Sequence, residues 1–131
     1  MSPILLDTNV FLWLQTDPGR LGDVLATLED PEAVLLLSAA TSWELAVKFG
    51  LGKLPLPQSP ADYVIDRAHR SGMSLIDVTH ADALAVAELP QLHRDPFDRL
   101  LVAQAQNRGC VLMTGDTALA GYPVETLVVG Q

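Results

Sequence analysis

The chain has 131 residues, 49% of them apolar and 18% charged, which is sufficient for one hydrophobic core and too apolar for a disordered protein. The formal net charge of −8 excludes a protein that attracts nucleic acid through an overall positive field. The single cysteine, Cys110, excludes an internal disulfide and a cysteine-cluster metal site. Any anionic substrate therefore requires a metal ion or a local basic patch.

The sequence contains no signal for export or membrane insertion. No basic region followed by a long apolar stretch begins the chain, so we expect no signal peptide. No window reaches about 18 uninterrupted apolar residues, so we expect no membrane contact. The lone cysteine is compatible with a reducing compartment, and we expect a cytoplasmic protein.

The first half of the chain predicts two strands, each followed by a helix. Residues 4–6 form a short apolar run typical of a buried strand, and a helix begins after Asp7. A turn at 16–19 precedes a helix with apolar residues at helical spacing over 21–28. Residues 33–37 predict the second strand. A helix over 39–49 follows, and a proline-containing loop leads away from it.

The second half continues this alternation. Helices are predicted over 60–70, 80–89 and 96–108, strands over 73–78, 110–113 and 124–129, and a short helical segment after Asp116. Strands separated by helices imply crossover connections and a mostly parallel sheet. We therefore predict a single α/β domain over residues 1–131, a three-layer sandwich with helices on both faces of the sheet.

Four acidic residues fall at equivalent places in this topology. Asp7 follows the first strand, Glu44 lies on the helix after the second, Asp98 lies in the first turn of the helix before the fourth, and Asp116 follows that fourth strand. Because connecting helices begin at the carboxyl edge of a parallel sheet, all four side chains can reach one edge. Each has a structural alternative: the three aspartates are also favoured helix caps, and a glutamate in a helix is often simply solvated.

Four carboxylates at one edge repel one another. Two like charges about 4 Å apart cost roughly 4 kcal/mol at an effective dielectric near 20, and a helix N-terminus offsets only about 0.3–1 kcal/mol of this. A divalent cation offsets far more. Oxygen ligands without cysteine favour Mg²⁺ or Mn²⁺, and a metal-activated water suits phosphodiester hydrolysis. The sequence leaves open whether one or two ions bind.

At these residues the chain resembles the PIN-domain family, and within it the VapC-type toxin ribonucleases of toxin–antitoxin pairs. The resemblance rests on four blocks, which follow one another in the expected order: Leu5-Leu6-Asp7-Thr8-Asn9-Val10, Ser42-Trp43-Glu44-Leu45-Ala46-Val47-Lys48, residues 93–105 beginning His93-Arg94-Asp95-Pro96-Phe97-Asp98, and Leu112-Met113-Thr114-Gly115-Asp116. The block over 93–105 is the most specific of the four.

The resemblance implies a five-stranded parallel sheet in the order 3-2-1-4-5 and an Mg²⁺-dependent endoribonuclease. It assigns the catalytic, metal-binding acids to Asp7, Glu44, Asp98 and Asp116. It also implies three partners: an RNA substrate, a cognate antitoxin protein and a second copy of the chain in a homodimer. Three further residues are expected to support the acids, with Asn9 and Thr114 orienting ligands and Asp95 acting as a helix cap or neighbour of the ligands.

Basic residues beside the acids are candidates for phosphate contacts. Arg94 and Arg99 flank the third acid, and Lys48 follows the second by one helical turn. These three are candidates for contact with RNA, and each is also a possible solvated charge or partner for a carboxylate. No direct catalytic role is expected for His93, because a metal-bound water needs no histidine, and Thr8 is expected only to help start its helix.

Two other classes of function remain open. A phosphatase or phosphotransfer protein would use Asp7 as its nucleophile, but the second acid that common aspartate phosphatases carry is replaced here by Asn9. A catalytically weak PIN-like module would bind RNA or protein without turnover. The complete set of four acids favours the nuclease.

Overall fold

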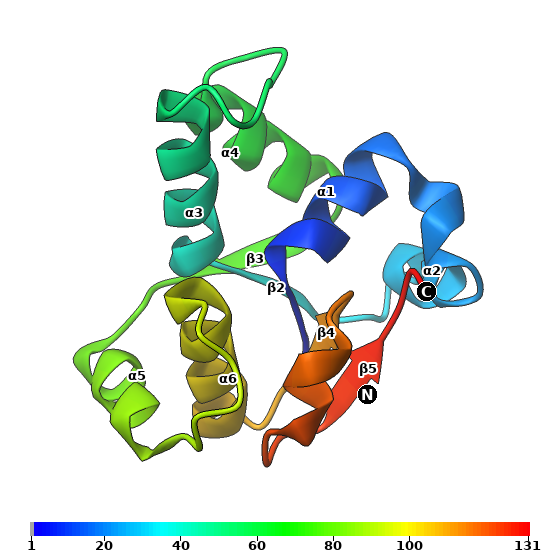
Figure 1. Ribbon diagram of the computed structural model, residues 1–131. Helices are drawn as coiled ribbons and strands as arrows, with labels where there is room; N and C mark the ends of the chain where they lie inside the picture. Colours follow the sequence, from blue (N-terminus) through cyan, green and yellow to red (C-terminus); the bar gives the residue numbers. More distant parts are fainter. Residues whose placement is uncertain (1) are drawn as a thin grey trace.

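The computed structural model describes residues 2–131 and contains a five-stranded parallel sheet in the order β3-β2-β1-β4-β5 (Figure 1). The predicted fold class and strand order are therefore confirmed. The strands are β1 Ile4–Leu6, β2 Leu35–Ser38, β3 Met73–Ile76, β4 Val111–Thr114 and β5 Thr126–Val128.

Helical segments connect these strands. The α-helices are α1 Thr8–Thr16, α2 Val24–Glu29, α3 Ala39–Gly50, α4 Pro60–Arg70, α5 His80–Ala85 and α6 Pro96–Arg108, and the 3-10 segments are η1 Pro18–Leu21, η2 Val86–Glu88 and η3 Thr117–Gly121. Within the described residues, none of these helices is long and apolar enough to cross a membrane.

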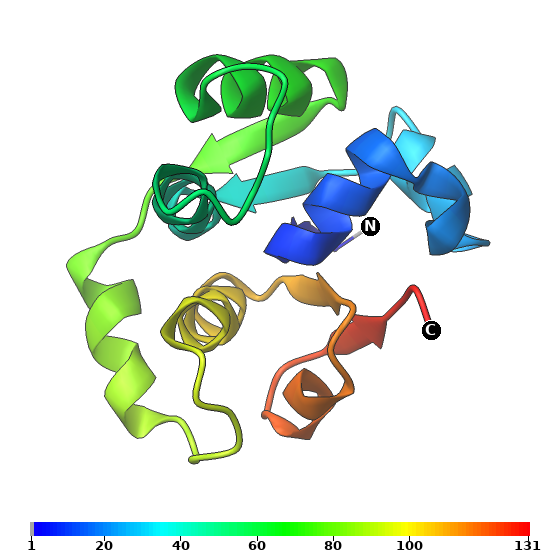
Figure 2. The same ribbon diagram turned by 45° about the horizontal axis from the view of Figure 1, so that its top comes forward.

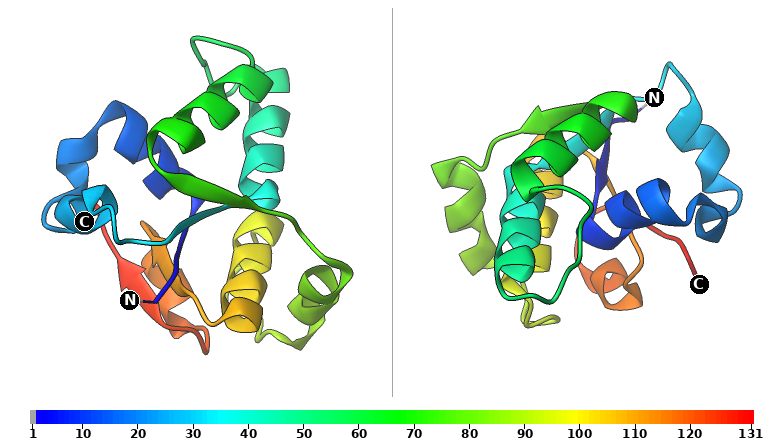
Figure 3. Two further views of the ribbon diagram at one scale, coloured as in Figure 1. Left: turned by 180° about the vertical axis from the view of Figure 1, so that it is seen from behind. Right: turned by 90° about the horizontal axis from the view of Figure 1, so that it is seen from above.

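The central strand β1 is buried on both faces, which gives the domain three layers. Ile4 and Leu6 point into one core with residues of α1, α2 and α4, whereas Leu5 points into a second core built largely by α6. This alternation explains why the strand is a continuous apolar run. Figure 3 shows the sheet from behind and from above, with α4 lying against the edge strand β3.

The register of the strands brings their carboxyl ends to one edge. Leu6 pairs with Met113, and the Asp7 amide donates to the Met113 carbonyl at 2.9 Å. The chain therefore leaves β1 and β4 side by side, with Asp7 next to Thr114. Any polar side chains that follow these two strands must lie close together.

Polar residues begin the helices at this same edge. Asp7 caps α1 by accepting from the Val10 amide, and Ser38 caps α3 by accepting from Ala40. Asp95 caps α6 by accepting from the Phe97 amide at 2.8 Å, with Pro96 at the first helical position. The cap prediction for Asp7 is thus correct, and it does not preclude a second role for this side chain.

Several predicted boundaries differ from the structure, and the strands predicted over 33–37, 110–113 and 124–129 are Leu35–Ser38, Val111–Thr114 and Thr126–Val128. The helix expected over 21–28 is divided into η1 and α2, because Gly22 adopts a φ of +58° and ends η1. The helix expected over 80–89 becomes α5 followed by η2. The strand expected over 73–78 ends at Ile76, since the carbonyl of Asp77 accepts hydrogen bonds from side chains of α6 instead of a neighbouring strand.

A buried polar network holds α6 in place beneath the sheet edge. Ser38 Oγ donates to Gln104 Oε1, and Gln104 Nε2 donates to Asp82 Oδ2 at 3.2 Å. Burial raises the pKa of Asp82, but hydrogen bonds from Thr79 and α6 and the charge of Arg108 outweigh it and bring that pKa to about 2. The network therefore links the end of β2 to α5 and α6, and so positions the helix that carries Asp98.

Candidate metal centre

The structure brings the four predicted acids to the carboxyl edge of the sheet. Asp7 follows β1, Glu44 lies in the second turn of α3, Asp98 in the first turn of α6, and Asp116 just after β4. Figure 2 shows α3 and α6 nearly end-on beside α1. The charges of Asp7 and Glu44 both act on Asp98, as expected of carboxylates that share one site.

Asp7 is held in one orientation by three hydrogen-bond donors of the surrounding chain. Its side chain is 3% exposed; Oδ1 accepts from the Val10 amide at 2.9 Å, and Oδ2 accepts from Thr114 Oγ1 at 2.5 Å and from the Gly115 amide at 3.4 Å. Burial raises the pKa of Asp7 above its ordinary value, although these hydrogen bonds act in the opposite direction. Asp7 is thus a rigid, buried carboxyl group at the centre of the site.

Glu44 is buried as well, and two side chains orient it. It is 4% exposed, its Oε1 accepts from Thr8 Oγ1 at 2.6 Å, and its Oε2 pairs with Lys48 Nζ at 2.5 Å. The hydrogen bond to Glu44 raises the pKa of Lys48. Thr8 was expected only to help start its helix; its hydroxyl instead orients the carboxylate of Glu44, because α1 and α3 pack against each other.

The pKa of Asp98 is strongly raised by its surroundings. Burial, followed by the charges of Asp95, Asp7 and Glu44, raises the pKa of Asp98 to about 7. Besides burial, three neighbouring carboxylates thus disfavour the negative charge on Asp98. The same arrangement favours binding of a cation, which would relieve the repulsion that protonation relieves in its absence.

Asp116 lies at the open side of the site, paired with His93. His93 Nε2 lies 2.8 Å from Asp116 Oδ2 and 3.6 Å from Asp98 Oδ2. The amide of Ala118 and the ring of His93 donate to Asp116 and lower its pKa. Ligand atoms of His93, Asp98 and Asp116 all lie within 4.8 Å of one another. His93, to which the sequence assigned no role, is therefore part of the site.

The three predicted supporting residues behave differently. Thr114 is fully buried; its hydroxyl donates to Asp7 and accepts from the Asp116 amide at 3.0 Å, so it joins two of the acids as expected. Asp95 caps α6 and adds its charge to the site. Asn9 is exposed on α1, and within residues 2–131 its side chain makes no hydrogen bond to the acids.

Arg99, a candidate for RNA contact, is buried in the structure. Arg99 is 7% exposed, and its guanidinium donates to the carbonyls of Pro90 and Val86 and to the Tyr122 hydroxyl. Three of its five N–H donors are thus used inside the protein, which favours a structural role for this side chain. Its place in the α6 pattern, directly after Asp98, carries no signal of this burial.

Lys48 and Arg94 remain accessible beside the acids. The Lys48 side chain is 46% exposed despite its ion pair with Glu44, and Arg94 is exposed in the segment leading to α6. Trp43 is 61% exposed and packs edge-on against Phe97, with ring centroids 4.9 Å apart. It is therefore not a core residue.

The loop that carries Asp116 is held by an aromatic ring. The indole of Trp13 lies so close to Gly115 that a Cβ built there would be 2.4 Å from the ring, and one built at Gly130 would be 2.6 Å away. Gln131 Nε2 also donates to the Gly115 carbonyl at 2.8 Å. The C-terminal residues and α1 thus fix the backbone between Thr114 and Asp116.

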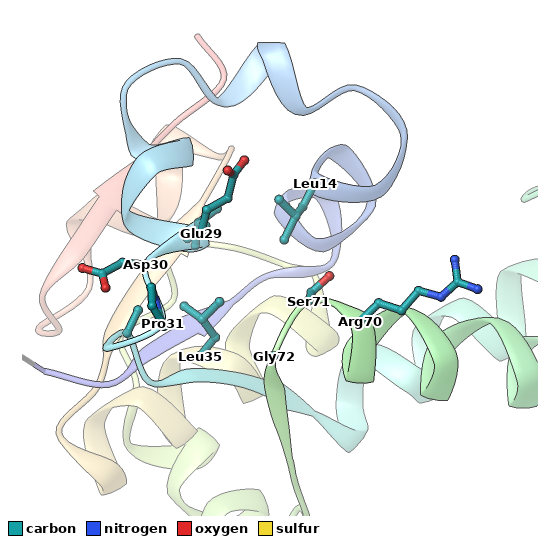
Figure 4. Close-up of a pocket in the computed structure, with 10 residues that line it drawn as sticks. Leu14, Glu29, Asp30, Pro31, Leu35, Arg70, Ser71 and Gly72 are labelled. Carbon is teal, nitrogen blue, oxygen red and sulfur yellow. The ribbon is translucent and has the colours of Figure 1, made fainter.

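A pocket with a volume of about 420 Å³ lies away from these acids. It is lined by Leu14, residues 28–31, Ala33, Leu35 and residues 70–72 (Figure 4). These segments precede β2 and β3, so the pocket opens at the amino edge of the sheet, opposite the carboxyl edge. It contributes nothing to the acidic site.

The acidic residues suit a hard divalent cation. Their carboxylate oxygens are the ligands that Mg²⁺ and Mn²⁺ prefer, and the charges of Asp95, Asp7 and Glu44 contribute, after burial, to the raised pKa of Asp98. Asp7 Oδ1 and both carboxylate oxygens of Glu44 each accept one hydrogen bond, so each keeps a lone pair for a cation, and the hydrogen bonds fix its direction.

A parallel sheet in this order with acids at its carboxyl edge is the arrangement of PIN domains. The PIN domain family model matches residues 4–124, and the chain belongs to this family. A stretch of 56 residues is 48% identical to Ribonuclease VapC16 of Mycobacterium tuberculosis, covering 43% of this chain and 40% of that protein. The chain therefore matches less than half the length of this relative.

Solved structures share the whole fold. VapBC2 from Rickettsia felis, bound to a DNA fragment from its promoter, has a chain that superimposes with a TM-score of 0.74 and 17% identity, covering 96% of this chain and 98% of that one. A toxin–antitoxin complex from Klebsiella pneumoniae has a TM-score of 0.67, 20% identity and coverage of 95% and 96%. FitAcB from Neisseria gonorrhoeae has a TM-score of 0.63 and 21% identity, covering 95% of this chain and 96% of that one.

Proposed function

We propose that this protein is an Mg²⁺-dependent endoribonuclease and the toxin of a toxin–antitoxin pair. The observation that carries the proposal is the convergence of four carboxylates, Asp7, Glu44, Asp98 and Asp116, at one edge of the sheet. Burial and the charges of Asp95, Asp7 and Glu44 raise the pKa of Asp98 there to about 7. Membership of the PIN family and the matched ribonuclease support the same activity.

In this proposal the four acids hold the cation, and the two buried acids and the two more exposed acids have different roles. Asp7 and Glu44 are buried and fixed by Thr114 and Thr8, so they define where the ion sits. Asp98 and Asp116 are more open and face the substrate. When bound, Mg²⁺ would polarise a phosphodiester and lower the pKa of an attacking water, acting as a Lewis acid.

Basic groups beside the acids would receive the RNA backbone. Lys48 and Arg94 are accessible on α3 and on the segment before α6, on two elements that bring acids to the site. With a net charge of −8, the protein has no general attraction for RNA, so these local cations and the metal would supply it. We expect weak RNA binding in the absence of the metal.

An antitoxin partner and a homodimer belong to the same proposal. The matched structures include toxin–antitoxin complexes, and α3 exposes an apolar stripe of Trp43, Val47 and Leu51, which are 61%, 38% and 63% exposed. These residues are four apart and lie on one face of the helix or just past its end. An apolar stripe beside the acids suits a protein segment that covers the site.

The accessibility of Asp7 argues against the phosphotransfer alternative. An aspartyl nucleophile must approach a phosphorus atom with a free oxygen, whereas Asp7 is 3% exposed and both of its oxygens accept hydrogen bonds. Its burial suits a metal ligand better than a nucleophile.

Cleavage of RNA by the purified protein tests the proposal. The parent protein, freed of any copurified partner, is incubated with total RNA in Mg²⁺, Mn²⁺ or EDTA, and the ends of the products are mapped. We expect metal-dependent cuts that Asp7→Asn abolishes. Glu29→Gln, at the opposite edge of the sheet, serves as the matched control and should cleave like the parent.

Two results would contradict the nuclease. Asp7→Asn protein that cleaves as fast as the parent would show that the activity does not use this site. Tight RNA binding without turnover in any divalent metal would favour the non-enzymatic PIN-like binding module instead.

A further inference from the structure

His93 contacts three parts of the acidic site through its two ring nitrogens. Its Nδ1 accepts a hydrogen bond from the Asp95 amide at 2.9 Å. Its Nε2 faces the carboxylates of Asp116 at 2.8 Å and Asp98 at 3.6 Å. The His93 side chain is 20% exposed. It therefore bridges the first turn of α6 and the loop after β4.

The contact with Asp95 determines where the imidazole carries its proton. A backbone amide can only donate, so the Nδ1 that accepts from it has no hydrogen. The neutral ring must then carry its hydrogen on Nε2, the nitrogen that faces the two carboxylates. Nε2 thus has a hydrogen to donate and no lone pair available for a metal ion in the ring plane.

We propose that His93 is a positioning residue that holds the carboxylate of Asp116 in place for metal binding, and is not itself a metal ligand. The inference rests on the proposed metal-dependent function. The Asp95 amide fixes the tautomer, Nε2–H fixes one oxygen of Asp116, and the second oxygen accepts from the Ala118 amide at 2.9 Å. Asp116 needs such a support because its side chain is 40% exposed.

The competing arrangement is direct ligation. His93, Asp98 and Asp116 present ligand atoms within 4.8 Å of one another, which is close enough for one ion to contact all three. Direct ligation through Nε2 would require the hydrogen to leave that nitrogen. Its transfer to Nδ1 would break the hydrogen bond from Asp95, so the ring cannot keep both contacts.

Two substitutions separate the two contacts of the ring. In His93→Gln the side-chain NH₂ group takes the place of Nε2 and can still donate to Asp116. In His93→Asn the side-chain oxygen takes the place of Nδ1 and can still accept from Asp95, but the side chain is too short to reach Asp116. His93→Ala removes both contacts, and His69→Gln, on the exposed surface of α4, is the matched control.

Binding of Mn²⁺ to the full chain, measured by electron paramagnetic resonance without RNA, tests the proposal. We expect His93→Gln and His69→Gln to bind Mn²⁺ within about threefold of the parent, and His93→Asn and His93→Ala to bind about 10–100-fold more weakly, as when other groups that orient metal ligands are removed. Pulsed spectra of the bound ion should show no directly coordinated nitrogen. Nitrogen NMR of the metal-free protein should show His93 with its hydrogen on Nε2, with the exposed His69 and His80 as internal references.

Three results would overturn the proposal: a nitrogen bonded directly to Mn²⁺ that His93→Gln removes, parent-like Mn²⁺ affinity in His93→Ala, or a metal-free ring with its hydrogen on Nδ1. Failure of the proposed function looks different. A parent protein that binds no Mn²⁺, yet shows the Nε2–H tautomer, would refute the metal site while supporting the hydrogen bond that positions Asp116.

Discussion

Thr8 Oγ1 donates a hydrogen bond of 2.6 Å to Glu44 Oε1, joining the first turn of α1 to the second turn of α3. Both residues are at most 5% exposed, so water does not substitute for this contact. Because Thr8 directly follows Asp7, one helix start fixes two acids. The backbone places Asp7, and the neighbouring hydroxyl places Glu44.

Thr8→Val should lower metal-dependent RNA cleavage by about 10–100-fold with little change in fold, because valine keeps the shape of threonine and removes the donor to Glu44. Thr8→Ser keeps the hydroxyl and should retain most of the activity. The measurement is the initial rate of RNA cleavage at saturating Mg²⁺. Thr16→Val, in the last turn of the same helix, is the control, and equal rates for both valine variants would contradict the orienting role.

Asp98→Asn should stabilise the metal-free protein at pH 8. The folded state binds the Asp98 proton with a pKa of about 7, against an ordinary value of 3.8, so the stabilising contribution is fully present below pH 3.8 and is lost as the pH rises through 7. The Asp98→Asn substitution removes this pH-dependent loss of stability, because asparagine does not ionise. We expect a gain of about 1–3 kcal/mol in unfolding free energy at pH 8, smaller than the pKa shift alone implies because the helix N-terminus favours the anion.

Urea denaturation in EDTA at pH 5 and pH 8 measures this effect. The gain in unfolding free energy of Asp98→Asn over the parent should be smaller at pH 5 than at pH 8. In a second series at pH 8 with Mg²⁺ in place of EDTA, the gain should also be smaller, because Mg²⁺ stabilises the parent. Glu29→Gln, at an exposed position, should show no comparable pH dependence. An Asp98→Asn protein no more stable than the parent at pH 8 would argue against crowded negative charge at this site.

Gly115→Ala should destabilise the loop that carries Asp116, because its Cβ would lie 2.4 Å from the Trp13 ring. We expect a loss of about 1–3 kcal/mol in unfolding free energy, as for other overpacked positions. Trp13→Leu should reduce the additional cost of Gly115→Ala in the double variant, which a thermodynamic cycle of urea denaturation measures. Gly19→Ala, where a Cβ meets nothing within 4 Å, is the control. Full additivity of the two changes would contradict the contact.

Substitution of Arg99 should lower stability, whereas substitution of Arg94 should raise the KM for RNA. Arg99→Met leaves two carbonyls and a tyrosine hydroxyl without their donor, so we expect it to cost about 2–4 kcal/mol in unfolding free energy. Arg94→Gln removes an exposed charge and should change stability by less than about 0.5 kcal/mol while raising the KM for RNA several-fold. Thermal unfolding and RNA cleavage kinetics of both proteins distinguish these roles. An Arg99→Met protein that is as stable as the parent but has a raised KM would support Arg99 as an RNA contact.

The strands and the positions of the acids follow from local sequence signals. Apolar runs, helix caps such as Asp95-Pro96, and the alternation of strand and helix predict a parallel sheet, and a parallel sheet places whatever follows its strands at one edge. The acids at 7, 44, 98 and 116 could therefore be named as neighbours before any coordinates. Helix ends such as Gly22 were less predictable, because a single glycine within an apolar pattern leaves open whether the helix stops there.

Only the tertiary structure decided what surrounds each acid. The partners of Glu44 and Asp116 lie 36 and 23 residues away in the chain, so no local pattern pairs Thr8 with Glu44 or His93 with Asp116. These contacts depend on how helices pack across the sheet, and the same packing buries Arg99 beside an exposed Arg94. The sequence by itself determined the strands and which acids could meet at one edge, because strands and helix starts have local signals and the carboxyl ends of parallel strands lie at one edge. The order of the strands was implied by the family resemblance and not by local signals. The packing of side chains from distant segments determined how those acids are held.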